Sequence, residues 1–140
     1  MKILCVDDEE TVVNTVSMYL RGLWSRAEML RPFDGATALE MFEEEQPDLV
    51  ILDLFLPDIS GYELIRRIRE QSTAPVLVLT ELAEGKDIAK ALDLGADACV
   101  TKPFHISVFL AKVKAVLRRC AMGSGVLGVW SVRATNSRLV

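Results

Sequence analysis

The stretch Leu49-Val50-Ile51-Leu52-Asp53 decides the fold, because it is apolar at four successive positions and then ends at a carboxylate. A strand with one face in water alternates apolar and polar residues, whereas a strand covered on both faces is apolar throughout. This stretch therefore predicts a buried strand of a parallel sheet. Similar runs occupy Ile3–Val6 and Pro75–Leu79, and weaker strand patterns occupy Ala98–Val100 and Glu28–Arg31.

Amphipathic segments separate these strands. Their apolar residues recur at spacings of three and four, and capping residues, glycine or proline stand at several of their ends. The expected helices cover Val12–Leu23, Ala36–Glu45, Tyr62–Glu70, Lys86–Leu94 and Ile106–Arg119. This alternation predicts an α/β fold, a doubly wound five-stranded parallel sheet with helices on both faces. The flavodoxin-like strand order 2-1-3-4-5 is the common arrangement at this size.

The composition fits one globular domain and argues against several other classes. The chain has 140 residues, of which 51% are apolar, and its mean hydropathy is +0.28. Sixteen basic and twenty acidic residues give a net charge of −4, which argues against nucleic-acid binding over the whole surface. No apolar run approaches the ~18–20 residues of a membrane helix, and the N-terminus lacks the apolar region of a signal peptide. We therefore expect no membrane association.

The cysteines indicate a reducing compartment. Cys5, Cys99 and Cys120 are the three cysteines of the chain, and they lie far apart without the spacing of a metal-binding pair. An odd count at these positions argues against a disulfide framework or a zinc site. We expect reduced thiols and a cytoplasmic location. The single histidine, His105, cannot by itself support a histidine-based metal site or catalytic triad.

Polar residues follow the carboxyl ends of four expected strands. Asp7 and Asp8 follow the first strand, Asp53 the third, Thr80 the fourth and Lys102 the fifth. In a doubly wound sheet, ligands bind outside these ends, where the strand order reverses. We therefore expect three carboxylates, a hydroxyl and an ammonium group to share one pocket.

This set of side chains favours a magnesium ion and a phosphoryl group. Carboxylates packed together repel one another unless a cation neutralises them. An all-oxygen ligand set suits Mg²⁺, which accepts one or two carboxylates together with water and phosphate oxygens. Asp53 is then either a metal ligand only or the nucleophile that accepts the phosphoryl group. Taken singly, each aspartate is equally consistent with a turn or a helix cap, so the hypothesis depends on the joint pattern.

At these positions the chain resembles the receiver domain of two-component response regulators. The resemblance covers residues 1–120, which we take as the receiver domain. It rests on Cys5-Val6-Asp7-Asp8-Glu9, Leu52-Asp53-Leu54-Phe55-Leu56-Pro57 with Gly61, Leu79-Thr80, Gly95-Ala96-Asp97 and Thr101-Lys102-Pro103-Phe104.

The resemblance implies a set of roles for the polar residues. A sensor histidine kinase would phosphorylate Asp53 in the presence of Mg²⁺. Asp8, Asp53 and the backbone carbonyl of Phe55 would bind the ion directly, and Asp7 would act mainly through water. Thr80 would hydrogen-bond the phosphoryl group and Lys102 would pair with it. The protein would then be a signalling switch rather than a turnover enzyme, catalysing only its own phosphorylation and dephosphorylation at Asp53.

The sequence departs from the family pattern at the switch residues. Cys99 stands where the family has an aromatic side chain, and Glu81 stands where it has a small residue. We expect Glu81 to point outward and Cys99 to pack against the helix at Lys86–Leu94. Phe55 and Leu82 are large and apolar, so both should hinder an attacking water and slow hydrolysis of the aspartyl phosphate.

The resemblance also implies an output surface and an output domain. OmpR-type regulators, which carry a winged-helix DNA-binding domain, dimerise through the fourth helix, the fifth strand and the fifth helix. We expect a homodimer through this face, although Ala98 and Val108 replace its acidic residues. The charges that remain there are Asp97, Lys90, Lys112, Arg118 and Arg119. Residues 121–140 resemble a linker and possible first strands of a missing output domain, through which alone DNA would be bound to regulate transcription.

Other functions remain open on the sequence alone. The chain could be a phosphorylation-independent scaffold with the receiver fold, or a stand-alone receiver. An aspartate-nucleophile phosphatase is less favoured, because that class places an Asp-x-Asp pair after its first strand and needs a cap domain. A flavin- or nucleotide-binding module is also disfavoured, since the acidic run Asp7-Asp8-Glu9-Glu10 would repel a phosphate.

Overall fold

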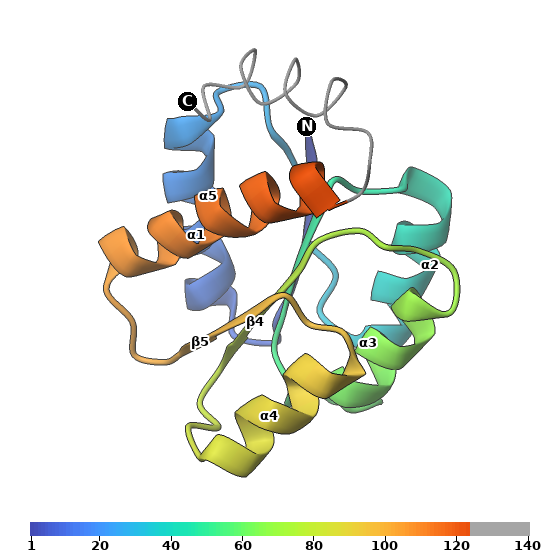
Figure 1. Cartoon of the computed structure of the whole chain (residues 1–140). Coiled ribbons are helices and arrows are strands. Elements are labelled where there is room, and N and C mark those ends of the chain that lie inside the picture. The colour runs from blue at the N-terminus through green and yellow to red at the C-terminus, as the bar shows by residue number, and fades with distance from the viewer. Residues whose placement is uncertain (124–140) are drawn as a thin grey trace.

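A central parallel sheet organises the chain in the computed structural model, which describes residues 1–123 (Figure 1). Its five strands have the order β2-β1-β3-β4-β5, so the predicted doubly wound topology is confirmed. The strands are β1 (Lys2–Val6), β2 (Glu28–Leu30), β3 (Leu49–Leu52), β4 (Val76–Thr80) and β5 (Ala98–Thr101). The helices are α1 (Glu10–Leu23), α2 (Gly35–Glu45), α3 (Gly61–Arg69), α4 (Gly85–Leu94) and α5 (Ile106–Gly123).

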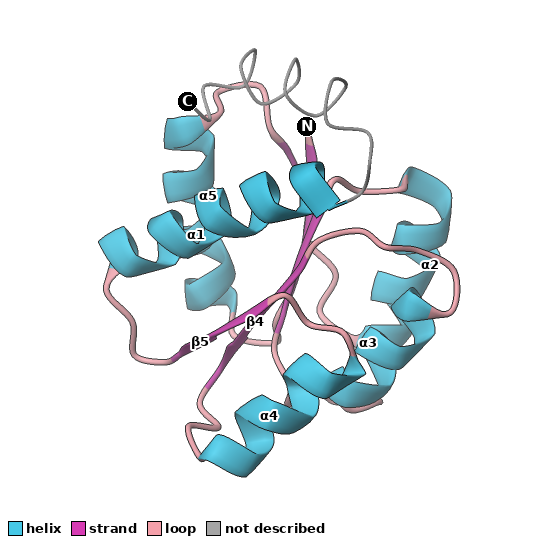
Figure 2. Ribbon diagram, viewed as in Figure 1, coloured by secondary structure: helices cyan, strands magenta, loops and turns pink. Residues whose placement is uncertain are grey.

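Helices cover both faces of the sheet (Figure 2). Helices α1 and α5 bury Val16 and Phe109 against one face, whereas α2, α3 and α4 bury Phe42, Ile65 and Ala91 against the other. Successive residues of a strand point to opposite faces. In β3, Leu49 and Ile51 therefore join the first apolar cluster, while Val50 and Leu52 join the second. This double burial is the physical reason why the central strands are apolar at every position.

The strand register brings the carboxyl ends of the strands to one edge of the sheet. Val6 lies beside Leu52 in the β1–β3 pair, so Asp7 and Asp53 are next to each other where these strands end. Thr80 lies beside Thr101 in the β4–β5 pair, directly before Lys102. The sheet therefore delivers the polar residues to a common edge, as the sequence predicts.

Element boundaries differ from the sequence expectation by a few residues. Helix α5 continues through Gly123, beyond the expected end at Arg119. Residues 121–123 therefore belong to this helix rather than to the expected linker. The rest of that linker and the expected output-domain strands, at 124–140, lie outside the described residues. Within residues 1–123, no helix is long and apolar enough to cross a membrane.

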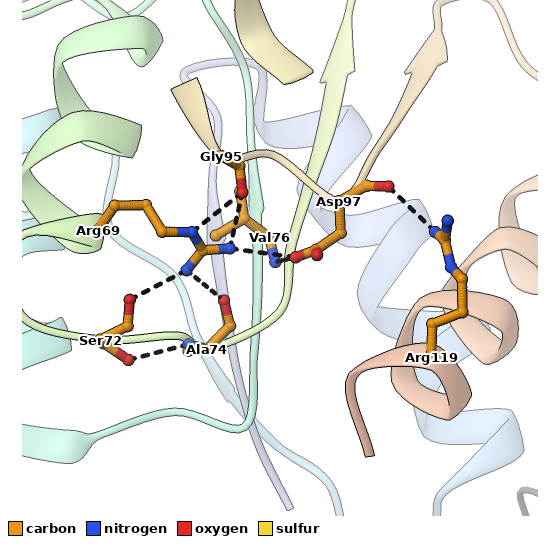
Figure 3. Close-up of polar contacts among 7 residues, drawn as sticks. All are labelled: Arg69, Ser72, Ala74, Val76, Gly95, Asp97 and Arg119. Atoms are coloured by element: carbon orange, nitrogen blue, oxygen red, sulfur yellow. Dashed lines mark hydrogen bonds and ion pairs between the residues drawn. The ribbon is translucent and has the colours of Figure 1, made fainter. Parts of the chain in front are cut away.

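Arg69, the last residue of α3, connects four segments on the α3–α4 side of the sheet (Figure 3). Its guanidinium donates to the carbonyls of Ser72 and Ala74 in the α3–β4 loop. It also donates twice to the carbonyl of Gly95, which caps α4, and once to the Asp97 carboxylate before β5. Arg69 thereby fixes the C-terminal end of α4 against the sheet.

Candidate metal centre

Three carboxylates meet at the carboxyl edge of the sheet. Oxygen atoms of Asp7, Asp8 and Asp53 all lie within 4.8 Å of one another. Asp7 and Asp53 are only 2% and 3% exposed, whereas Asp8 is open to solvent. Burial of like charges at this distance is unfavourable unless a cation lies among them. The oxygen-only donor set and the spacing fit a hard divalent cation such as Mg²⁺.

The Lys102 ammonium group reaches this acidic cluster from the end of β5. Its Nζ donates to Asp7 Oδ2 at 2.8 Å and to Asp53 Oδ2 at 2.9 Å. A third ion pair joins it to Glu9 Oε1 at 3.2 Å. The Lys102 side chain is 7% exposed, so these contacts are formed largely out of water. One buried cation therefore connects the two buried carboxylates.

These contacts set the protonation of the buried groups. Burial lowers the pKa of Lys102, but the hydrogen bonds and charges of Asp7 and Asp53 outweigh burial, and the net pKa is raised. Lys102 is therefore a cation at neutral pH. Burial raises the pKa of Asp7, and the hydrogen bonds from Lys102 and from the Glu9 amide only partly oppose this. The pKa of Asp7 therefore stays above its usual value in spite of the Lys102 contact.

The β3–α3 loop holds Asp53 through its own backbone. The Phe55 amide donates to Asp53 Oδ1 at 3.1 Å, while the Phe55 side chain is 58% exposed. The Gly61 amide closes the loop by donating to the Leu54 carbonyl at 2.8 Å. A Cβ at Gly61 would lie 2.4 Å from the Asp53 carbonyl oxygen, so this close approach requires glycine.

Thr80 lies at the same edge of the sheet, in the last position of β4. It is fully buried, and its hydroxyl accepts a hydrogen bond from the Leu82 amide at 3.3 Å. The structure therefore brings Asp7, Asp8, Asp53 and Lys102 into direct proximity and places Thr80 at the end of the neighbouring strand.

The residues that depart from the family pattern lie close to this edge. Cys99 is half-buried and packs against the apolar cluster that contains Ala91 of α4. Leu82 is half-buried and packs against the same cluster. Glu81 is exposed, and it lines a hollow of about 810 Å³ that also borders Lys102. The hollow lies between α1, which contributes Thr15, and the segment that leads from β5 into α5.

The α4–β5–α5 face differs in one respect from the sequence expectation. Asp97, which we counted among the charges of this face, uses its carboxylate inside the fold to accept from Arg69 and from the Val76 amide. The Arg119 guanidinium donates to the Asp97 backbone carbonyl at 3.0 Å. A groove of about 500 Å³ runs along this face, bordered by Ile88, Leu92, Ala98 and Cys99. Asp97 also lines this groove, but its carboxylate is already paired with Arg69.

The sequence analysis assigned no structural role to three residues that make contacts at the site or around it. Glu9 was seen only as part of the first motif, yet it pairs with Lys102. Arg69 has a sequence signal, because it stands four residues after Ile65 on the buried side of α3. Asp58 binds the start of α2 across 23 positions of sequence, and no local pattern indicates this contact.

One known protein family matches most of the chain. The family model described as the response regulator receiver domain matches residues 3–114. The chain is 42% identical over 119 residues to the regulatory protein VanRc of Enterococcus gallinarum, covering 84% of this chain and 50% of that protein. It is 40% identical over 119 residues to the transcriptional regulatory protein KdpE of Mycobacterium tuberculosis, covering 84% and 51%.

A solved structure supports the same likeness. The BeF3-activated N-terminal receiver domain of Klebsiella pneumoniae RstA superposes with a TM-score of 0.78 at 31% identity. The match covers 84% of this chain and 99% of that domain. The chain spans about half the length of the curated relatives it matches, so the comparison concerns their receiver portion.

Proposed function

Because this chain belongs to the response regulator receiver domain family, we propose that it is a phosphorylation-dependent switch that accepts a phosphoryl group on Asp53 from a sensor histidine kinase. The observation that carries the proposal is the position of Lys102 Nζ, 2.8 Å from Asp7 and 2.9 Å from Asp53. An ammonium group held between two buried carboxylates is already in place to pair with an anion that forms on either one.

The acidic cluster supports a magnesium site. In this proposal Asp8, Asp53 and the Phe55 backbone carbonyl hold Mg²⁺ directly, and Asp7 acts mainly through water. Bound Mg²⁺ would neutralise charge on the phosphoryl oxygens during transfer. Lys102 neutralises only part of the cluster, since it brings one positive charge to three carboxylates and is also paired with Glu9. The remaining negative charge favours a divalent cation at this edge of the sheet.

The transfer step follows from the contacts of Asp53. A carboxylate oxygen of Asp53 attacks the phosphorus, and the phosphorus–nitrogen bond of the phosphohistidine donor breaks, so that the imidazole leaves. Lys102 exchanges its contact with Asp53 Oδ2 for a phosphoryl oxygen and stays anchored by Asp7. The hollow of about 810 Å³ borders Lys102 and Glu9, so in this proposal the donor approaches from the side of α1 and the β5–α5 segment.

The output of the switch is a change at the α4–β5–α5 face. The aspartyl phosphate adds about −2 charge and three acceptor oxygens, and the Thr80 hydroxyl turns toward them. The Thr80 hydroxyl binds the Leu82 amide, so its movement acts directly on the loop before α4. If 99% of the molecules have the inactive packing of this segment before phosphorylation and 99% have the active packing after it, phosphorylation must favour the active packing by about 5.5 kcal/mol.

The downstream partners follow from the relatives. KdpE is named a transcriptional regulatory protein, and it is about twice as long as the matched segment. We infer that this receiver controls transcription through an OmpR-type output domain that binds DNA, and that the active form is a homodimer through the α4–β5–α5 face. Exposed Leu92 and Val108 would form the apolar centre of that contact.

Intact-mass measurement after incubation with Mg²⁺ and acetyl phosphate tests this function. The wild type should gain one phosphoryl group, and Asp53→Asn should gain none. Chelation of Mg²⁺ should also abolish the gain. If the wild type remains unmodified while its fold is intact, the proposed switch is refuted and the protein is better described as a phosphorylation-independent scaffold.

A further inference from the structure

The Asp58 side chain attaches the loop that carries Phe55 to the start of α2. Asp58 Oδ1 accepts from the Gly35 amide at 2.7 Å, and Asp58 Oδ2 accepts from the Ala36 amide at 2.8 Å. The first N–H groups of a helix have no partner within the helix and bind a carboxylate well. Both oxygens of Asp58 are thus used to connect the β3–α3 loop to a different element.

The packing around this contact is close. A Cβ at Gly35 would lie 2.3 Å from Ile59 Cγ1, so the loop residue after Asp58 lies directly on the first residue of α2. The pKa of Asp58 is lowered, first of all by the hydrogen bond from Gly35. This agrees with a carboxylate that is stabilised in its charged, bound form. Residues 58 and 59 are therefore held against α2 by both polar and apolar contacts.

Helix α2 has a separate cap of its own. The Asp34 side chain accepts from the Thr37 amide at 2.7 Å, which is the usual N-cap contact. Asp34 and Asp58 thus carry the same charge and bind the same helix end, but only Asp58 belongs to the β3–α3 loop. Substituting these two aspartates one at a time therefore distinguishes stabilisation of α2, to which both contribute, from restraint of the loop, to which Asp58 contributes.

The restraint acts on the segment between two fixed points. Asp53 directly follows β3, and Asp58 is bound to α2, so Phe55 lies in a short span held at both sides. A backbone carbonyl in a fixed span loses less conformational entropy when it binds a ligand than one in a free loop. We propose that Asp58 is a positioning residue for the metal, because it holds the β3–α3 loop in the geometry in which the Phe55 carbonyl binds Mg²⁺. This rests on the proposed function.

The test compares Asp58→Ala with Asp34→Ala, which removes an equal charge from the same helix end. Isothermal titration of each protein with Mg²⁺ gives the dissociation constant. We expect about a tenfold weaker affinity in Asp58→Ala, the usual scale for loss of a residue that supports a metal ligand. Asp34→Ala should stay within about twofold of the wild type, since its loss weakens the helix and leaves the loop attached.

Hydrogen exchange of the metal-free proteins supplies a second measurement. The amides of residues 54–56 and 58–60 should exchange faster in Asp58→Ala than in Asp34→Ala. The two variants are compared at denaturant concentrations that lie equally far below their unfolding midpoints. Equal Mg²⁺ affinities in the two variants would overturn the proposal, as would equal loop exchange. If Asp58→Ala does not fold, the pair Asp58→Asn and Asp34→Asn is compared by the same criteria. A wild type that binds no Mg²⁺ would instead refute the proposed function, while the exchange measurement would still decide whether Asp58 restrains the loop.

Discussion

Arg69 Nη2 and Asp97 Oδ2 form an ion pair at 3.1 Å, and the same Asp97 oxygen accepts the Val76 amide at 2.8 Å (Figure 3). The two side chains are 21% and 29% exposed, so the pair is partly shielded from water. This relationship joins the end of α3 to the start of β5. It also uses the Asp97 carboxylate within the fold, so a partner across the α4–β5–α5 face would have to compete with Arg69 for it.

Arg69→Ala should lower the free energy of unfolding by about 2–4 kcal/mol, because it leaves the carbonyls of Ser72, Ala74 and Gly95 without this donor and the Asp97 carboxylate without its cation. Urea unfolding followed by circular dichroism measures this loss. Arg66→Ala is the matched control on the same helix. Among the described residues, the ion pairs of Arg66 are with Glu63 and Glu70 on the exposed side of α3, so its loss should cost far less stability than the loss of Arg69. Equal losses in the two variants would contradict the role assigned to Arg69.

Gly61→Ala should destabilise the protein, because the added Cβ meets backbone atoms of Asp53 and Leu54 at 2.4 and 2.5 Å. Backbone cannot move aside as a flexible side chain does, so we expect a loss of about 1–3 kcal/mol or more. Gly85→Ala is the control, since nothing lies within 4 Å of its Cβ position. Thermal unfolding of both variants checks this prediction. A Gly61→Ala protein as stable as Gly85→Ala would show that the β3–α3 loop is not tightly fitted.

Much of the fold could be predicted because the determining signals are local. The uninterrupted apolar run at Leu49–Leu52 reflects burial on both faces, and the polar residues after each strand mark the edge where parallel strands end. Asp7, Asp53 and Lys102 were placed together by this reasoning, and the structure confirms their proximity. The predicted strand order was enough to bring these three residues together, and no long-range pattern in the sequence was needed.

The rest could not be predicted because it depends on where side chains point. Asp97 was assigned to the outer face from its position before β5, but its carboxylate turns inward to Arg69. Asp58 looks like an ordinary turn residue after Pro57, and its binding to Gly35 and Ala36 depends on how α2 packs beside the loop. Such contacts between distant segments leave no periodicity in the sequence.

The thiols should react slowly with iodoacetamide at neutral pH, and the rate should rise with pH as thiolate forms. Burial raises the pKa of Cys5 to about 12 and that of Cys120 to about 11, and it also raises the pKa of Cys99. Peptide mass spectrometry at several pH values should find alkylation last at fully buried Cys5. Rapid alkylation of Cys5 at pH 7.5 would contradict its burial in β1.

Phe55→Asn should accelerate loss of the phosphoryl group from phosphorylated protein. The Phe55 side chain stands two residues after Asp53 and is exposed, and we expect this large apolar group to hinder an attacking water. An amide in its place would admit water and could orient it toward phosphorus. The half-life of label, followed by intact mass after removal of the donor, measures the effect. An unchanged half-life would show that Phe55 does not limit hydrolysis.

The most direct test of the central claim is to locate the phosphoryl group. Protein labelled with acetyl phosphate and Mg²⁺ is reduced with borohydride, which converts an aspartyl phosphate to homoserine, and the peptides are sequenced by mass spectrometry. The account predicts homoserine at residue 53 alone, and none when Mg²⁺ is chelated. Modification at another carboxylate, or labelling at Asp53 that does not depend on Mg²⁺, would contradict it.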